Sequence, residues 1–212
     1  MQLNVPASVQ LFLFADKLVP ADIAFSAGTR VSYSQKKVRT NELATNLLAF
    51  TTWDLYQNQI INLEVQHGKK MIFIPTERLC VSMKKDLPVS GSLESWLVGG
   101  INAEEELKEV IHALFAEDEI WPHRKIILTV SADACDMGLG KAGQNGSRNP
   151  VFSGFSGDID FEVERTIASE IEPLFDLKVQ QWNQFILNSP KIAGFLITAC
   201  RAALNSRVLQ ND

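Results

Sequence analysis

The start of the chain predicts one helix followed by an irregular stretch. Apolar residues at helical spacing predict a helix over residues 8–18, with Ser8 as its N-cap and Leu11, Phe12 and Phe14 turned inward. Residues 26–39 show no such period, and we expect a loop or a short hairpin there. The chain therefore begins with a helix that buries a strongly apolar face.

A second helical period begins at Thr40 and predicts two successive helices. The apolar face of the first consists of Leu43, Leu47 and Leu48. We expect Phe50–Thr52 to break this helix, with Thr51 or Thr52 capping a second helix that ends near Asn58.

Alternation of apolar and polar residues then predicts two paired strands. In residues 60–66, Ile61, Leu63 and Val65 would lie on one side of a strand. Residues 67–70, His-Gly-Lys-Lys, supply a glycine for a turn, and residues 71–75 return as the second strand until Pro75 ends the pairing.

The middle of the chain predicts a long helix and a buried strand. Asn102 is a candidate N-cap, and Glu105 follows it at the spacing of a capping box. The apolar stripe of this helix, over residues 102–118, consists of Leu107, Val110, Ile111, Leu114 and Phe115. Residues 125–130, Lys-Ile-Ile-Leu-Thr-Val, form an apolar run that we interpret as a buried strand.

A glycine-rich stretch separates this region from a helical end. Residues 137–158 hold six glycines and one proline, typical of a loop or linker. Apolar stripes follow, and Ser189-Pro190 marks the start of a last helix. The stripes consist of Ile167, Ile171, Leu174 and Phe175, then Trp182, Phe185 and Ile186, then Phe195, Leu196, Ala199 and Ala203.

Together these patterns predict a helix-rich α+β protein. Its parts would be an α+β unit over residues 1–136, a loop over residues 137–158, and a helical part over residues 159–212. We expect the helical part to pack on the first unit, because alone it would bury too little apolar surface.

Composition narrows the class of protein further. Apolar residues make up 46% and charged residues 21% of the 212 residues, which is ordinary for a globular protein. Residues 1–101 hold ten Lys/Arg and eight Asp/Glu (+2), whereas residues 102–212 hold ten and seventeen (−7). A basic excess this small argues against a general nucleic-acid coat or a polybasic membrane anchor.

The cysteines and the first residues bear on the compartment. Cys80, Cys135 and Cys200 are odd in number and far apart, so we expect neither a disulfide framework nor a cysteine-rich zinc site. The start of the chain lacks a basic segment before its apolar run, and charged residues interrupt that run. We therefore expect a soluble, cytoplasmic protein without a signal peptide or membrane span.

The order helix, helix, two-stranded hairpin over residues 40–76 resembles a winged helix-turn-helix. In that resemblance residues 51–59 correspond to the recognition helix and residues 60–75 to the wing. It implies that four residues face the major groove and two lysines meet phosphates. These residues are Thr51, Thr52, Gln57 and Asn58, then Lys69 and Lys70. The segment that corresponds to the recognition helix has no Arg or Lys and carries Asp54, so protein contact is an alternative use of the same shape.

A second resemblance concerns the pattern of apolar and polar residues from residue 46 to residue 101. The runs "NLLAFTTWDL", "IINLEV", "IFIPTE" and "GSLESWLVGGI" are similar to the Golgi phosphoprotein 3-like family. That family is mostly helical and binds phosphoinositide head groups in a basic pocket. The resemblance implies that Trp53 and the basic residues Lys36, Lys37 and Arg39 meet an anionic head group.

Catalytic chemistry has two weaker candidates in the sequence. Asp133, Cys135 and Asp136 follow the expected strand, and His123 is near enough in sequence for a Cys–His nucleophile to be considered. Gly138, Gly140 and Gly143 have the G-x-G-x-x-G spacing, but no helix start follows them, so we expect a loop. Lys141 and Arg148 would supply positive charge if this loop bound an anion.

The sequence as a whole favours macromolecular binding without catalysis. The first hypothesis is a winged-helix-like module that associates with DNA or with protein, with a possible homodimer through its helical end. The alternatives are a peripheral membrane adaptor for anionic lipid head groups and an enzyme that uses residues 133–148. None of the three histidines, His67, His112 and His123, is spaced for a metal site, and we expect no cofactor.

Overall fold

The computed structural model describes residues 4–20, 28–31, 36–70, 74–85, 87–115, 119, 121–142 and 159–208. The described part is mixed α and β with helices dominant, which confirms the helix-rich α+β class. The helices are α1 (Ala7–Leu13), a single 3-10 turn (Ala15–Lys17), α2 (Thr40–Gln57), α3 (Ser92–Gly99), α4 (Leu107–Ala113), α5 (Pro122–Asp136), α6 (Arg165–Asn188) and α7 (Pro190–Val208). The strands are β1 (Gly28–Val31), β2 (Lys36–Arg39), β3 (Ile61–Lys70), β4 (Ile74–Met83), β5 (Glu105–Glu106), β6 (Gly140–Ala142) and β7 (Ile159–Val163).

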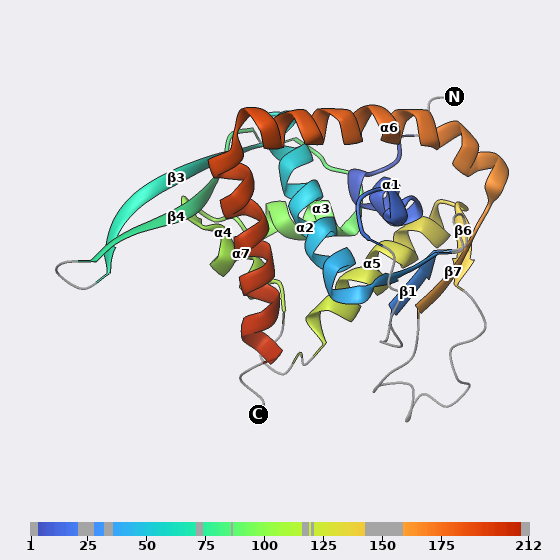
Figure 1. The fold of residues 1–212 in the computed structure, drawn as a ribbon, viewed down its shortest axis with the longest axis horizontal. Helices are drawn as coiled ribbons and strands as arrows, with labels where there is room; N and C mark the ends of the chain where they lie inside the picture. Colours follow the sequence, from blue (N-terminus) through green and yellow to red (C-terminus); the bar gives the residue numbers. More distant parts are fainter. Residues whose placement is uncertain are drawn as a thin grey trace.

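Helix α1 lies in the centre of the fold, and all of its residues are buried. It contacts α2, α5 and α6, which lie around it in Figure 1. As predicted, Leu11, Phe12 and Phe14 are buried. Ser8, however, lies within the helix and Pro6 precedes it as the N-cap. A short helix this apolar is stable only when neighbours cover it on all sides.

A small sheet joins strands from residues 28–39 to strands from residues 140–163. Its strand order is β2-β1-β7-β6, in which β1 and β7 are parallel and the outer pairs are antiparallel. Phe161 of β7 packs edge-on against Phe12 of α1, with ring centroids 5.0 Å apart. The expectation of an entirely helical end is therefore wrong at residues 159–163, and that of a loop is wrong at residues 140–142.

Aromatic side chains hold α6 against the rest of the fold. Helix α6 runs along one side of the molecule, at the top of Figure 1. Trp182 contacts Trp53 and Phe50 of α2, with ring centroids 5.4 and 5.9 Å apart. Phe175 stacks on Phe14, with centroids 5.3 Å apart. The helical end thus packs on the first part of the chain, as its apolar stripes predict.

Two carboxylates link three helices that are far apart in sequence. Glu94 of α3 accepts hydrogen bonds from the backbone N–H and the hydroxyl of Ser8 in α1. Asp133 of α5 accepts the corresponding pair from Ser92 at the start of α3. Each carboxylate satisfies an N–H group in the first turn of a helix, which has no partner within that helix.

Helix α2 is continuous, so the expected break at Phe50–Thr52 is wrong. The hydroxyl of Thr52 donates to the carbonyl oxygen of Leu48 at 2.8 Å. This bond to the preceding turn lets a threonine stay within a helix. Because one helix replaces the expected two, the described chain has no turn between helices in residues 40–57.

Residues 125–130 belong to helix α5, not to a strand. Pro122 occupies the first turn, where its missing N–H costs nothing. Ile126, Ile127, Val130 and Ala134 are buried at helical spacing. A short apolar run does not distinguish a buried helix from a buried strand, which explains the error.

The helix expected over residues 102–118 is shorter. Glu105 and Glu106 pair with β4 as strand β5, and α4 begins only at Leu107. Asn102 is therefore not an N-cap.

Candidate interaction surface

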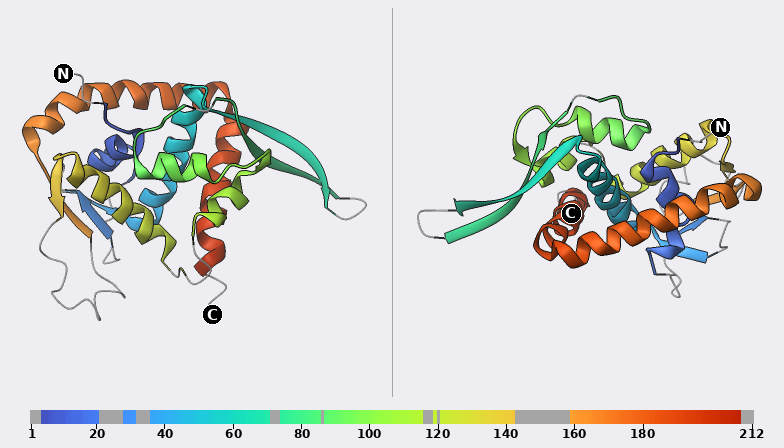
Figure 2. Two further views of the ribbon diagram at one scale, coloured as in Figure 1. Left: turned by 180° about the vertical axis from the view of Figure 1, so that it is seen from behind. Right: turned by 90° about the horizontal axis from the view of Figure 1, so that it is seen from above.

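Strands β3 and β4 form a long arm that leaves the body of the protein. Their antiparallel pairing runs from Ile61↔Met83 at the base to Lys70↔Ile74 at the far end. Figures 1 and 2 show the far half standing clear of the helices from three directions. At the base, Leu63, Leu79 and Val81 are buried in the common core. The arm is thus rooted in the core and extends into solvent.

The expected position of the hairpin turn is wrong. Gly68, Lys69 and Lys70 continue strand β3, and β4 includes Pro75, which pairs with Lys69. A proline is tolerated there because, in the part of the chain that the structure describes, β5 pairs with the outer edge of β4 only at Cys80 and Val81.

Helix α7 holds the arm at the seventh of its ten residue pairs, His67↔Glu77. Lys191 in its first turn lies 2.7 Å from Glu77 of β4, and Nδ1 of His67 on β3 lies 3.2 Å from the same carboxylate oxygen. The hydrogen bond from Lys191 lowers the pKa of Glu77. Positions 68–70 and 74–76 lie beyond this contact.

Strand β3 is an edge strand along its whole length. Among the residues that the structure describes, it pairs with β4 and with no other strand. One row of backbone N–H and C=O groups therefore faces away from the sheet. Such an edge can accept a further strand, and proteins usually cover or shorten it.

The structure separates the residues expected to face DNA. Thr51 and Thr52 are buried in α2, so neither can reach a groove. Gln57 and Asn58 are exposed at the end of α2, where Asn58 donates to the carbonyl oxygen and carboxylate of Asp54. Lys69 and Lys70 are placed by their backbone at the far end of β3.

Trp53 lies apart from the basic residues with which it was expected to meet a lipid head group. Lys36, Lys37 and Arg39 lie on β2, an edge strand of the other sheet, where Lys36 pairs with Asp16 at 3.2 Å. Trp53 is only 1% exposed, because it lies within the aromatic contacts of α2 and α6. At about 1.5 Å per residue, it lies about 20 Å along α2 from the end of β2. Its expected contact with a head group is therefore wrong.

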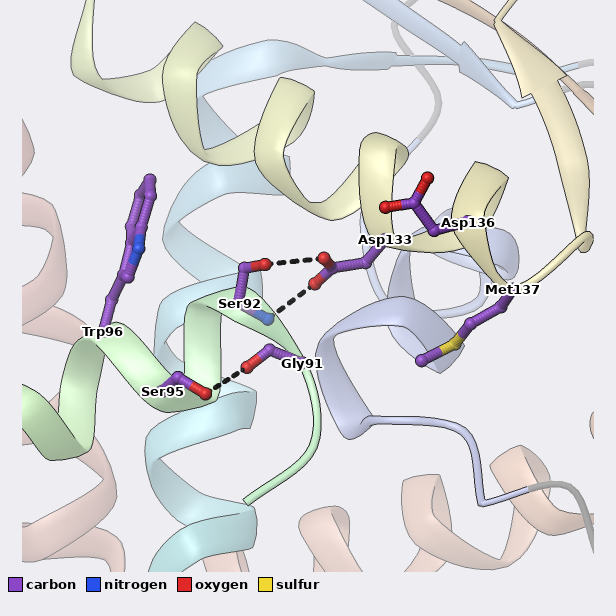
Figure 3. A pocket seen from close by; sticks show the side chains of 7 residues that line it. All are labelled: Gly91, Ser92, Ser95, Trp96, Asp133, Asp136 and Met137. Carbon is purple, nitrogen blue, oxygen red and sulfur yellow. Dashed lines mark hydrogen bonds between the residues drawn. The ribbon is translucent and has the colours of Figure 1, made fainter. Parts of the chain in front are cut away.

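A pocket of about 370 Å³ lies beside Asp133 (Figure 3). The backbone N–H of Ser92 donates to Asp133 at 2.7 Å and its hydroxyl donates at 2.6 Å, so both carboxylate oxygens serve the start of α3. Asp136 and Met137 also line this pocket. The geometry gives Asp133 a structural role in capping a helix.

The other catalytic candidates do not converge. His123 and Cys135 lie in the same helix, about 18 Å apart at about 1.5 Å per residue, so they cannot form a Cys–His pair. Burial lowers the pKa of His123. Gly138 follows the C-cap of α5 with φ 71°, and Gly140 lies in β6 against the carbonyl oxygen of Glu162. Lys141 is exposed in β6, whereas Gly143 and Arg148 lie outside the described residues.

A second pocket, of about 280 Å³, is lined by polar groups whose proximity was not predicted from the sequence. Asp54 of α2 pairs with Lys178 of α6 at its rim, and Asn58 and Glu94 also line it. Burial raises the pKa of Glu94 to about 6. These side chains come from three helices, so no local pattern could have indicated the pocket.

Comparisons of the chain with protein-family models, with curated proteins and with solved structures return no match. Within the described residues, no group of three or more His, Cys, Asp or Glu side chains is arranged to hold a metal ion. None of the described helices combines the length and apolar character that a membrane span requires.

Proposed function

We propose that this protein is a non-catalytic protein-interaction module whose recognition element is the β3–β4 arm. The observation that carries the proposal is the arm itself, which projects from the core and leaves the whole edge of β3 without a partner strand among the described residues. A two-stranded ribbon in water is marginally stable on its own. A partner strand or surface along the far half would supply the contacts that the body does not.

The position of α2 favours protein contact over DNA reading. A recognition helix must present side chains to the major groove. Thr51 and Thr52 are instead buried, and the described residues show one helix where a helix-turn-helix requires two. Lys69 and Lys70 stand at the far end of the arm, where they suit an acidic partner surface.

Shortening the arm tests this function. A two-residue Asn-Gly turn between His67 and Glu77 replaces residues 68–76, the part of the arm beyond its contact with α7. His67 and Glu77 then flank a tight hairpin turn. A photo-reactive amino acid at Gln66 would report contacts of the arm, and the same residue at Gln181, exposed on α6, is the matched control. We expect protein crosslinks from position 66 that disappear in the shortened chain. Crosslinking from position 181 should be the same in the full and the shortened chain.

The proposal is overturned if position 66 gives no crosslink in the full chain, or if crosslinks survive removal of residues 68–76. Far-ultraviolet circular dichroism and urea unfolding establish that the shortened chain still folds. Fluorescence anisotropy with a mixed-sequence DNA duplex checks the alternative. Salt-sensitive binding that Lys69→Glu with Lys70→Glu removes would identify the arm as a DNA-binding element instead.

A further inference from the structure

We propose that the partner of the arm is a second copy of this chain, joined edge to edge through antiparallel pairing of the two β3 strands. This inference rests on the proposed function, because it names the occupant of the β3 edge. The pairing would continue each three-stranded sheet across a two-fold axis, in the order β5-β4-β3-β3-β4-β5. The same surface is used on both copies, as a closed symmetric dimer requires.

The two edges of the arm are not equivalent, and only that of β3 suits a long partner strand. On the β4 side, β5 already occupies Cys80 and Val81, and Pro75 offers no N–H group. On the β3 side, ten consecutive residues of strand stand at the edge. None of these residues is a proline, so a ladder of backbone hydrogen bonds can form along the strand.

The alternation of β3 restricts which residues can lie opposite each other. Ile61 and Leu63 are buried, whereas Asn62 and Glu64 are exposed. A two-fold axis perpendicular to the sheet keeps each face on its own side. Residues directly opposite each other in antiparallel strands point to the same face. Even-numbered residues of one copy must therefore lie opposite even-numbered residues of the other.

The charges of β3 then select one register. Glu64 is its acidic residue, and Lys69 and Lys70 stand at its far end. In a register centred on His67, the position of Lys70 in each copy lies opposite Glu64 of the other. Opposite charges meet twice in this arrangement, in which residues 64–70 of the two β3 strands pair with each other. Parallel pairing in register would instead place each charge beside its like, which is unfavourable.

The projection of the arm leaves room for this arrangement. Twelve residue steps separate the two Ile61 positions in the register centred on His67. At about 3.4 Å per residue, the bases of the two arms are about 40 Å apart. The helical bodies would therefore lie at opposite ends of a shared sheet, consistent with the clear space around the far half in Figures 1 and 2.

Disulfide trapping tests the register directly. In a Cys135→Ser background, His67→Cys places a thiol at the two-fold axis, next to the same thiol of the second copy. We expect a covalent dimer on mild oxidation in a non-reducing gel. Asn62→Cys is the matched control, because Asn62 is also exposed on β3. Position 62 of the second copy would lie ten residues away from it along the paired strands. Dimers from position 62 and none from position 67 would overturn the register and the proposal.

Charge exchange tests the same contact without a crosslink. Sedimentation velocity over a concentration series measures the dimer dissociation constant. We expect Glu64→Lys or Lys70→Glu alone to raise this constant about tenfold, because two like-charged pairs form. The double exchange, Glu64→Lys with Lys70→Glu, restores opposite charges and is expected to return it to within about threefold of the parent value. Failure of the double exchange to rescue dimerisation would overturn the pairing.

A chain that remains monomeric at every concentration and gives no covalent dimer at position 67 also overturns the inference. The function proposed above would survive that result if photo-crosslinks from position 66 to another protein persist and depend on the arm. If those crosslinks are absent as well, the arm is no interaction element and both proposals fail.

Discussion

The carboxylate of Glu94 accepts two hydrogen bonds from Ser8, one from its backbone N–H at 3.0 Å and one from its hydroxyl at 2.8 Å. The two residues belong to α3 and α1, and Glu94 is only 4% exposed. The carboxyl group therefore joins the central helix to its neighbour inside the core, where an ionised group is costly to bury.

Glu94 gives the stability of the fold a pH dependence of predictable sign. Burial raises its pKa in the folded state from 4.5 to about 6. The protonated form is thus favoured by folding. The contribution of Glu94 to the free energy of unfolding is fully present below pH 4.5 and is lost as the pH rises through about 6. A shift of this size corresponds to about 2 kcal/mol.

Urea unfolding of the parent chain and of Glu94→Gln between pH 3.5 and 7.5 measures this contribution. The free energy of unfolding of the parent should fall by about 2 kcal/mol relative to that of Glu94→Gln as the pH rises across this range. Because the other titrating groups are the same in both proteins, the difference isolates Glu94. A difference that does not change with pH would contradict the assignment.

The helix faces of this protein were largely readable from its sequence, because they depend on local spacing. Leu43, Leu47 and Leu48 are buried together as expected, and the last helix begins at Pro190. Some errors arose where a tertiary contact overrides the local pattern. Strand β5, for example, forms at Glu105–Glu106 only because β4 lies beside it. Residues 125–130, in contrast, were assigned to a strand because a short apolar run fits a buried helix equally well.

The candidate surface could be predicted only in part. Alternation near Ile61 indicated a strand, but nothing in residues 60–75 shows that the pairing extends to Met83 or leaves the body. Ion pairs such as that of Asp54 with Lys178 join positions on different helices, far apart in sequence. No short-range spacing encodes such contacts, whereas the hydrophobic period of each element is repeated many times.

Asp133 is expected to act as a helix cap rather than as a catalytic group. Asp133→Ala removes the acceptor of both hydrogen bonds from Ser92 and should lower the free energy of unfolding by about 1 kcal/mol. Asp136→Ala is the matched control, because Asp136 is exposed on the same helix. That change should stay within about 0.5 kcal/mol. Urea titration measures the free energy of unfolding of both variants. Equal losses in the two variants would contradict the capping role.

Trp182 is expected to contribute strongly to the packing of α6. It is buried against Trp53, Phe50 and Phe185. Trp182→Ala leaves a large cavity there and should cost about 3–5 kcal/mol of unfolding free energy. Gln181→Ala, at the exposed neighbouring position, should change it by less than about 0.5 kcal/mol. Urea unfolding followed by circular dichroism measures both, and a small cost for Trp182→Ala would mean that α6 is not held by this cluster.

The three cysteines should differ sharply in their reaction with iodoacetamide. Cys200 is fully buried, and burial raises the pKa of its thiol far above the usual range. Burial also raises the pKa of Cys80. Since the thiolate is the reactive form, neither should be labelled in the folded protein, whereas the partly exposed Cys135 should be labelled first.

Mass spectrometry of peptides from a labelling time course in native buffer gives the order of reaction. A parallel sample in high urea is the control, and there all three thiols should react at similar rates. Trp182→Ala provides a sharper comparison, because Cys200 lies on α7, which packs on both α2 and α6. If α6 loosens in that variant, Cys200 should be labelled sooner than in the parent chain. Labelling of Cys200 ahead of Cys135 in the parent chain would contradict its place in the core.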